Sequence, residues 1–470
     1  MKKLGFILLC VLLVLPIVSA SRDAMMSDKV TVRTTISSTV DIVPKKSSFT
    51  LQDVDIKLFL VPVGDERSKL VSLEMSSNAE KLENHILFSY ERPKEDIEFK
   101  VEAVIEANGE FIPVHKKIVY PLVNVPASVD KYLEPGEIIN SEHPAVVLKA
   151  NQLAHGEDDA YVIAYKIGAW IQDNIDYSLD SLTSDVSQPV SWVIENKRGV
   201  CDEITSLFIA MLRAVGIPAR FISGLAYTDY NNLNDFGPHA WADVYFPTVG
   251  WVPFDITYGE YGYVDAPHIK LKEDVDADDV STKFSWKGVN VDLEPQELKI
   301  EGEIIETGRR VKKLLDIETR ALKSGVGFGS YNLIEAKVKN PNSFYVITDL
   351  TLTKTQGVES LDKHRKNILV KPREEKKFYW TVKIKEGLEE GFVYTYPVGV
   401  YTTRNASSTV SFNAQKKFDA YSKEEIKGFI DYFDSGIEEG EERVPEQNLE
   451  NPSEIGGFAR FLAWLNGLFG

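Results

Sequence analysis

The sequence predicts a multidomain α+β protein, in which a central block of helices and strands is flanked by N-terminal and C-terminal β-sandwich domains. Apolar and polar residues alternate over much of the first and last thirds of the chain, which is typical of strands. Between them, apolar residues recur every three or four positions, which is typical of helices. The 470 residues also exceed one compact domain, which usually holds roughly 150 residues.

The first 20 residues are typical of a secretory signal peptide. Lys2 and Lys3 precede an apolar run, and Val18-Ser19-Ala20 supplies small residues for cleavage. The run is shorter than a comfortable membrane span. We therefore expect an exported protein that is extracellular or associated with the cell surface. The alternative is a membrane anchor formed by residues 4–20 if the segment stays uncleaved.

Cysteine and charge narrow the functional classes further. The two cysteines are Cys10, inside the predicted signal peptide, and Cys201. Cleavage would leave one thiol, so the mature chain has no internal disulfide to form. Lys and Arg number 53 against 71 Asp and Glu, a formal net charge of −18. Because binding to nucleic-acid phosphates requires positive charge, we expect no nucleic-acid partner.

Residues 28–127 are predicted to form the N-terminal β domain. Alternation is clear at 30–34, 55–60 and 97–104 and recurs briefly at 117–120. The central domain is predicted over 130–280. There a helix is expected to follow Asp158 and Asp159, because acidic residues favour a helix N-terminus, and strands are expected at 239–246 and 251–257.

Alternation returns over 290–418, which predicts an immunoglobulin-like β-sandwich. Residues 419–470 are predicted to be an acidic linker and a short amphipathic helix, whose apolar face runs from Phe458 to Phe469. This helix is too short to span a bilayer. We favour its docking on the protein itself or on another copy; the alternative is a membrane or partner contact.

Cys201 lies where a helix is expected to begin. Gly199-Val200-Cys201 precedes apolar residues at helical spacing, beginning with Ile204 and Leu207. The helix dipole and the unpaired N–H groups of a helix N-terminus favour the thiolate, which is the nucleophilic form of cysteine. A lone cysteine in an apolar helix is usually a buried small side chain, so catalysis here requires a base and a group that orients it.

His239 and Asp255 are the candidates for those two roles. The alternating pattern of 239–246 places His239 on one face of a strand, and a second strand holds Asp255 among apolar neighbours. A carboxylate in such surroundings needs a partner. If the two strands pair antiparallel, Asp255 can accept a hydrogen bond from one imidazole nitrogen while the other faces Cys201.

With these residues the chain resembles the transglutaminase-like superfamily, as an exported prokaryotic-type member. Four motifs in the expected order carry the resemblance: Gly-Val-Cys at 199–201, Arg-Ala-Val-Gly-Ile-Pro-Ala-Arg at 213–220, His-Ala-Trp at 239–241, and Gly-Trp at 250–251 followed by Asp255 and Thr257.

The resemblance implies a papain-like fold for the central domain, with Cys201 as nucleophile, His239 as base and Asp255 as the residue that orients the base. It also implies a second donor for the oxyanion, for which Trp170, Gln188 and Trp192 are candidates. Outside this site, Arg213 and Arg220 are expected to stabilise the fold, and Trp241 is expected in the core or in the wall of a cleft.

A Cys-His-Asp site predicts a thioester formed from a peptide or carboxamide, so the expected partner is a protein or peptide substrate. Water would then give a thiol peptidase or amidase, which we favour; an amine would give a protein cross-linking transglutaminase. A non-catalytic cell-surface binding or scaffold protein is a further alternative. No cofactor is predicted.

No metal site is predicted either. The acidic run that begins at Asp274 copies the start of a calcium loop, but the sixth position is Asp279 where glycine is required, and the twelfth is Ser285 where glutamate is required. We interpret the run as a solvated acidic turn.

Overall fold

The computed structural model describes residues 24–62, 64–179, 187–228, 235–277 and 280–434, which belong to two compact units that divide between Lys312 and Lys313. The predicted signal peptide, the apolar face from Phe458 to Phe469 and most of the predicted acidic linker lie outside the described residues. No helix within the described ranges has the length and apolar character needed to cross a bilayer.

The first unit begins with two sheets that share one hydrophobic core. β1 (Lys29–Pro44) is central to one sheet, and β2 (Thr50–Leu58) belongs to the other. Every second residue of β1 from Val30 to Val40 is buried, as the alternating sequence predicts. Side chains from both sheets form a single buried cluster. The other strands of this region are β3 (Ser68–Met75), β4 (Ala79–Lys81), β5 (Ile86–Glu91) and β6 (Ile97–Asn108).

Three later strands return to these sheets, so the expectation that a separate domain begins at residue 290 is wrong. β14 (Thr282–Val289) pairs with β2, whereas β15 (Val291–Pro295) and β16 (Lys299–Thr307) both pair with β1. The second unit begins only at Lys313. Alternation identifies a strand but not its partner, and nothing local marks β14 to β16 as belonging to the earlier sheets.

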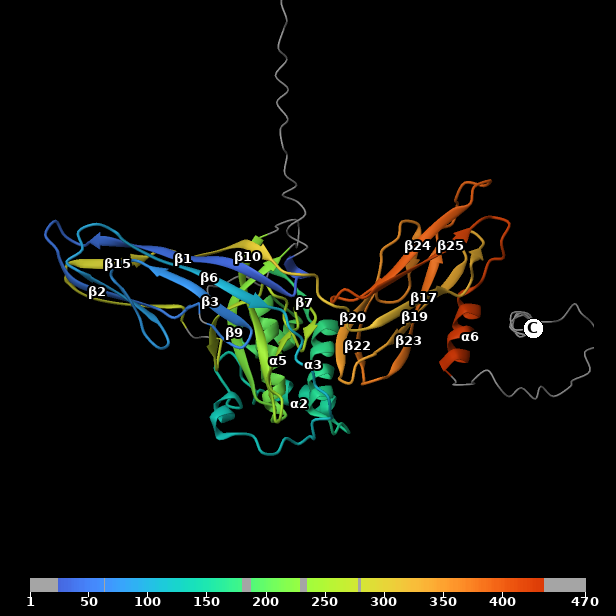
Figure 1. Cartoon of the computed structure of the whole chain (residues 1–470), viewed down its shortest axis with the longest axis horizontal. Coiled ribbons are helices and arrows are strands. Elements are labelled where there is room, and N and C mark those ends of the chain that lie inside the picture. Colours follow the sequence, from blue (N-terminus) through green and yellow to red (C-terminus); the bar gives the residue numbers. More distant parts are fainter. Residues whose placement is uncertain (1–23, 63, 180–186, 229–234, 278–279, 435–470) are drawn as a thin grey trace, which may run out of the picture. The chain divides into compact units, whose positions relative to one another are not determined.

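The central part of the first unit is an α+β block. Its sheet has the strand order β12-β11-β10-β9-β13, and α5 (Cys201–Ala214) packs against β9 and β10 (Figure 1). The strands are β9 (Ala219–Thr228), β10 (Asp235–Phe246), β11 (Gly250–Asp255), β12 (Glu260–Tyr261) and β13 (Ile269–Asp274). The other helices are α2 (Pro144–Ala154), α3 (Ala160–Asn174) and α4 (Val190–Asn196), with a short 3₁₀ helix η2 at Ala127–Tyr132. β7 (Asp176–Tyr177) and β8 (Arg198–Gly199) form a short parallel pair.

Asp159 starts α3, as the sequence predicts. Its carboxylate accepts the Tyr161 N–H (3.1 Å) and the Ile118 N–H (3.2 Å), so one buried side chain both caps the helix and fixes the segment that leads to it. The strand expected at 117–120 is absent, because only an isolated pairing of Val119 with Asp159 forms there.

The acidic run after β13 fixes a distant loop. Asp276 accepts backbone N–H groups from Glu137 (2.5 Å), Ile138 (3.2 Å) and Ile139 (2.8 Å). Both carboxylate oxygens are therefore used by the chain itself. Arg213 from α5 donates to the Val275 carbonyl beside it (2.7 Å), so the turn also contacts the helix that begins at Cys201.

The second unit also has two sheets around one core, in which Trp380 is fully buried. Its strand orders are β17-β19-β23-β21 and β18-β25-β24-β20-β22. The strands are β17 (Asp316–Ala321), β18 (Gly325–Val326), β19 (Tyr331–Lys339), β20 (Val346–Leu352), β21 (Val358–Ser360), β22 (Arg365–Val370), β23 (Glu375–Ile384), β24 (Tyr394–Tyr401) and β25 (Ser407–Ala414).

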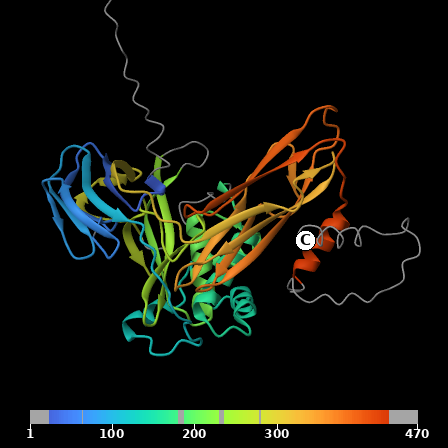
Figure 2. The same cartoon turned by 45° about the vertical axis from the view of Figure 1, so that its right-hand side comes forward.

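A linker that begins at residue 419 is a wrong expectation, because α6 (Lys423–Asp434) packs on the second unit. Ile426 is fully buried and Phe429 nearly so, and both contact Leu333 of β19. Figure 2 shows α6, in red, beside the strands of this unit. Four acidic residues in twelve masked the apolar face of the helix in the sequence.

We predict that Gly224→Ala strongly destabilises the first unit. A Cβ on Gly224 in β9 would overlap the Ile269 carbonyl oxygen of β13 and come within 2.7 Å of the buried Trp241 ring. Overpacking of this kind typically costs about 1–3 kcal/mol of unfolding free energy. Urea unfolding followed by tryptophan fluorescence measures the change.

Gly237→Ala is the matched control, because Gly237 lies on the neighbouring strand and has no atom within 4 Å of the Cβ position. Equal unfolding midpoints for the two variants would contradict the tight packing of Gly224 between β13 and Trp241.

Candidate active site

Cys201 is the first residue of α5, as its sequence position predicts. Val200 before it has extended backbone (φ −104°, ψ −168°), and the helix continues to Ala214 with nearly every side chain buried from Glu203 onward. Cys201 itself is partly exposed and is a free thiol. The nucleophile candidate therefore occupies the N-terminal end of a helix that is otherwise enclosed in the protein.

Glu203 organises the segment that leads into α5. Its carboxylate accepts the Val200 N–H (2.7 Å) and the Gln188 N–H (3.1 Å). Gly199 makes room for this arrangement, since a Cβ there would lie 2.9 Å from the Glu203 Cβ. The glycine two residues before Cys201 thus has a steric reason: the chain passes against the carboxylate that satisfies the N–H of Val200.

Antiparallel pairing of β10 and β11 brings His239 and Asp255 together. Residues Ala242 and Tyr245 of β10 lie opposite Phe254 and Trp251 of β11, so the expected strand arrangement is confirmed. α5 contacts the same strand near His239, because the Thr205 hydroxyl donates to the neighbouring Ala240 carbonyl (3.1 Å). Helix and sheet therefore meet beside the imidazole.

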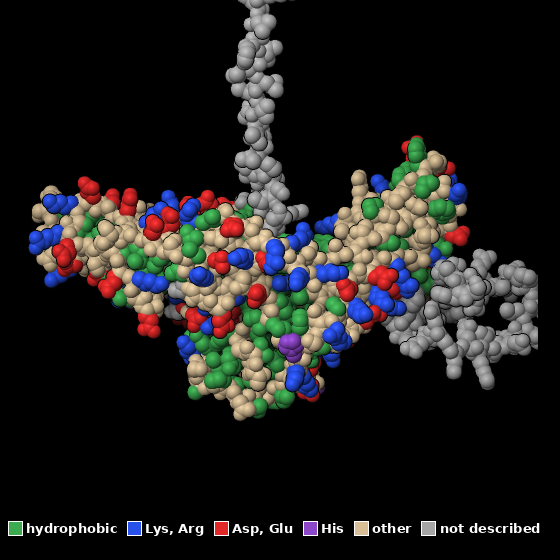
Figure 3. Space-filling view, in the orientation of Figure 1, with side chains coloured by type: hydrophobic (Ala, Val, Ile, Leu, Met, Phe, Trp, Pro, Cys, Tyr) green, Lys and Arg blue, Asp and Glu red, His purple; other side chains and the backbone are tan. Residues whose placement is uncertain are grey.

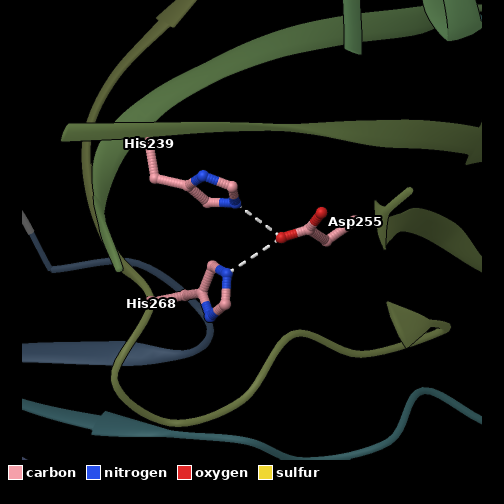
Figure 4. Close-up of side chains that lie close together, drawn as sticks. All are labelled: His239, Asp255 and His268. Carbon is pink, nitrogen blue, oxygen red and sulfur yellow. Dashed lines mark hydrogen bonds and ion pairs between the residues drawn. The ribbon is translucent and has the colours of Figure 1, made fainter. Parts of the chain in front are cut away.

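The His239 imidazole bonds the Asp255 carboxylate through Nε2, 2.7 Å from Oδ2 (Figure 4). The other carboxylate oxygen, Oδ1, accepts the Tyr258 N–H (3.0 Å). Asp255 is fully buried, and the His239 side chain is 7% exposed. Cys201 is among the groups whose charge raises the pKa of His239, and Nδ1 is the ring nitrogen that Asp255 leaves free. The pairing of His239 with Asp255 is thus established, and the role of Cys201 stays a prediction.

The comparisons with known proteins concern this part of the chain. Residues 149–256 match the family model of the transglutaminase-like superfamily. They form a transglutaminase-like core. The match contains Cys201, His239 and Asp255, as well as α3 to α5 and the strands β9 to β11.

Two curated relatives match short segments. The uncharacterized protein YebA of Bacillus subtilis is 35% identical over 78 residues, which is 14% of this chain and 11% of that protein. A protein-glutamine gamma-glutamyltransferase of Pseudomonas aeruginosa is 26% identical over 111 residues, 22% of this chain and 16% of that protein. This chain therefore spans only a small part of the length of either relative.

Solved structures show weaker likenesses. A protein from Cytophaga hutchinsonii described as a candidate cysteine protease is 18% identical, with 60% of this chain and 93% of that chain covered and a TM-score of 0.46. Red sea bream transglutaminase is 10% identical, with 77% and 92% covered and a TM-score of 0.21. Neither likeness is strong enough to bear on the reaction.

The charges at the centre of the transglutaminase-like core favour an ion pair. Burial lowers the pKa of His239, but Asp255 and Cys201 outweigh burial and hold that pKa well above its usual range. Burial raises the pKa of Asp255, but His239 and His268 outweigh it, so that pKa falls far below its usual range. The Asp255 carboxylate therefore stays ionised and holds a proton on His239.

His268 is a residue of this cluster that the sequence did not reveal. Its side chain is fully buried, and its Nε2 lies 3.1 Å from Asp255 Oδ2, the oxygen that His239 also contacts. Its Nδ1 lies 2.5 Å from Asp265 Oδ1. None of the four motifs includes His268, and a histidine just before a strand is too common to identify it.

Two sets of side chains here have ligand atoms close enough together to hold a metal ion. His239, Asp255 and His268 form one, and Glu260, Asp265 and His268 form the other, with ligand atoms within 4.8 Å of one another in each. Both nitrogens of His268 already face carboxylate oxygens. A metal would therefore have to displace one of these hydrogen bonds.

Of the three candidates for the second oxyanion donor, Gln188 contacts the first turn of α5, because its backbone N–H bonds the Glu203 carboxylate. The rings of Trp170 and Trp192 contact cations instead: Lys197 Nζ lies 4.7 Å from the Trp170 ring centroid, and the Arg198 guanidinium lies 5.5 Å from that of Trp192.

The residues expected to build the fold do so. Arg213 donates to the carbonyls of Glu134 (2.8 Å) and Ala219 (2.9 Å), and Arg220 pairs with Asp243 (2.9 Å). Trp241 is only 1% exposed, which places it in the core.

We predict that Glu203→Ala destabilises the core by about 2 kcal/mol or more, because two buried N–H groups lose their acceptor and each such loss typically costs about 1–3 kcal/mol. Chemical unfolding measures the loss. Glu195→Ala is the control, since Glu195 is an exposed glutamate on α4. A Glu203→Ala variant as stable as Glu195→Ala would contradict the role given to the carboxylate.

Alkaline pH should also destabilise the first unit. Burial lowers the pKa of His268, but Asp265 and Asp255 outweigh burial and raise it from 6.5 to about 9. Protonation of His268 therefore stabilises the fold fully below pH 6.5, and this contribution is lost as the pH rises through about 9. Burial beside Asp265 raises the pKa of Glu260 from 4.5 to about 8. The folded state therefore also loses stability at Glu260 as the pH rises from 4.5 to about 8.

Melting temperatures between pH 5 and 10 test this expectation. Glu260→Gln, which keeps the shape of the side chain without its charge, should lose less stability between pH 5 and 8 than the native protein. A melting temperature that rises through this range would contradict the assigned protonation states.

Proposed function

We propose that this chain is a cysteine-dependent enzyme that forms a thioester on Cys201 from a peptide or carboxamide and hydrolyses it. The observation that carries the proposal is the hydrogen bond between His239 and the buried Asp255, with Cys201 at the start of α5 as a group that acts on the charge of His239. In this reading Cys201, His239 and Asp255 are the nucleophile, the base and the orienting carboxylate of a thiol peptidase or amidase. The substrate is a protein or peptide.

The geometry suits each step of acyl transfer. The proton of the Cys201 thiol resides on His239, and Sγ of Cys201 attacks the carbonyl carbon of the substrate to give a tetrahedral oxyanion. The oxyanion forms at the N-terminus of α5, where N–H groups without partners inside the helix favour negative charge. Collapse breaks the C–N bond, and the imidazolium gives its proton to the leaving amine. Water then attacks the thioester with His239 as the base, the C–S bond breaks, and the carboxylic acid leaves as Cys201 is regenerated.

Hydrolysis is the preferred outcome because Cys201 is partly exposed rather than enclosed in the protein, which favours access of water. A cross-linking enzyme must keep water away from the thioester until an amine arrives. Cross-linking is the second candidate, and one observation favours it: the Pseudomonas aeruginosa relative is named as a protein-glutamine gamma-glutamyltransferase.

We extend the proposal to the surroundings of the core. Residues 1–20 would direct export, and the paired sheets before and after the core in the sequence would be β-sandwich modules, the second one immunoglobulin-like.

On the face shown in Figure 3, basic and acidic side chains are interspersed, and no broad basic surface for a polyanion stands out.

Thiol labelling distinguishes an enzyme from a binding or scaffold protein. At pH 6, iodoacetamide should alkylate Cys201 at least about tenfold faster than in His239→Ala, because an ordinary thiol with a pKa near 8.5 is almost fully protonated there. Peptide mapping by mass spectrometry assigns the label to Cys201. The control is His155→Ala, an exposed histidine at the end of α2. An unreactive Cys201 in the folded native protein would reject the enzyme proposal.

Product analysis separates the two reactions. We expect the protein to release peptides from casein, with a loss of roughly 10³-fold or more in Cys201→Ala and no effect of His155→Ala. A biotinylated primary amine is included in the same reaction. Cys201-dependent incorporation of biotin without peptide release would establish cross-linking instead of hydrolysis.

A further inference from the structure

Two imidazoles converge on one oxygen of Asp255. His239 Nε2 lies 2.7 Å and His268 Nε2 lies 3.1 Å from Asp255 Oδ2, and they reach it from β10 and from the segment just before β13 (Figure 4). A Cys-His-Asp mechanism requires only the first of these contacts. The second histidine is fully buried, so solvent cannot supply or replace its hydrogen bonds.

The second nitrogen of His268 is also engaged by a carboxylate. Nδ1 lies 2.5 Å from Asp265 Oδ1, and Glu260 Oε2 lies 4.0 Å away. A neutral imidazole has one N–H and one lone pair, so it would direct that lone pair at one of the two carboxylates. An imidazolium donates to both. The contacts of the ring therefore indicate that His268 carries a positive charge.

Charged groups from several elements surround His268. Asp255 lies at the end of β11, Glu260 on β12 and Asp265 in the following turn, whereas His239 faces the ring from β10 at 5.3 Å between centroids. From the segment before β3, Arg67 donates to the Asp265 carbonyl (3.2 Å).

Aromatic rings prevent His268 from turning. The rings of Trp241 and Tyr258 each lie 5.3 Å from the imidazole and nearly perpendicular to it. Asp265 Oδ2 has no hydrogen-bond partner among the described residues, whereas Oδ1 faces His268 Nδ1, and the charge of the buried Arg67 also acts on Asp265. The raised pKa of Glu260, about 8, leaves that carboxyl mainly neutral at pH 7. Asp255 and Asp265 are then the two anions that His268 bridges.

We propose that His268 is a positioning residue of the acyl-transfer site: its imidazolium bridges Asp255 and Asp265, fixes the carboxylate that orients His239, and shares that carboxylate's charge. The proposal deepens the proposed function and rests on it. Because Asp255 Oδ2 is divided between two imidazoles, it attracts the proton of His239 less strongly than an unshared carboxylate would. His268 thus sets how readily His239 accepts and returns a proton.

Nitrogen-15 NMR of the histidine rings in the full chain tests the proposal without relying on turnover. At pH 7.5 His268 should show the shifts of an imidazolium. In His268→Gln, which removes the charge but keeps an N–H donor, the pKa of His239 should rise by about one unit, a tenfold increase in proton affinity. A neutral His268, or an unchanged His239 pKa in folded His268→Gln, would overturn the proposal.

Asp265→Asn covers the case in which His268→Gln fails to fold. His268 is retained there but loses one anion, so its pKa should fall by about one unit; an unchanged value would contradict the bridge. Trp241→Phe is the packing control, since it changes a ring beside both histidines but no charge, and a His239 shift as large as that of His268→Gln would assign the effect to packing.

Metal analysis and alkylation provide two further readouts. One equivalent of a divalent metal bound by the native protein and lost in His268→Gln would overturn the proposal, because a metal would then occupy the place of the second proton. The pH profile of Cys201 alkylation should be displaced in His268→Gln but not in Trp241→Phe. The two proposals can fail separately. If the NMR results are as expected but the protein neither cleaves casein nor incorporates the amine, the proposed reaction is rejected and the bridging role of His268 is retained.

Discussion

The arrangement of the central block depends on one buried negative charge, that of Asp255. A carboxylate with no solvent contact is costly unless donors surround it. Here three donors from separate places meet it: His239 on β10, His268 before β13, and the N–H of Tyr258 in the turn after β11. The sheet order β12-β11-β10-β9-β13 brings these three segments around the carboxylate. Each segment is held in place because it supplies a hydrogen bond to the same buried charge.

The segment before Cys201 also depends on one carboxylate, that of Glu203. Cys201 is partly exposed, but the chain before it is fixed by Glu203, which accepts two N–H groups, and by Gly199, which leaves room for that carboxylate. The nucleophile candidate is thus held by a rigid N-terminal turn and the base candidate by a rigid strand. Pre-organisation of this kind is what covalent catalysis requires, because neither partner has to be ordered when substrate arrives.

The sequence predicted what local patterns encode. Apolar spacing placed the start of α5 at Cys201, and alternation with an acid among apolar residues indicated that β10 and β11 carry His239 and Asp255. His268 was not predictable, because it acquires its partners only through the turn between β11 and β13. The strands β14 to β16 were recognised as strands but assigned to the wrong domain, since the pairing of β15 and β16 with β1 joins residues 247 to 277 positions apart. Local periodicity holds no information about such partners.

The return of β15 and β16 to β1 has a consequence for the order of folding. The N-terminal sheets are completed by strands that are synthesised after the whole transglutaminase-like core, so the core is an insertion within a flanking domain. Until those strands arrive, one edge of β1 lacks its hydrogen-bond partners, and an open edge invites pairing with other chains. The two N-terminal sheets are therefore completed late in synthesis. They receive their last strands only after the residues that surround Cys201 have been made.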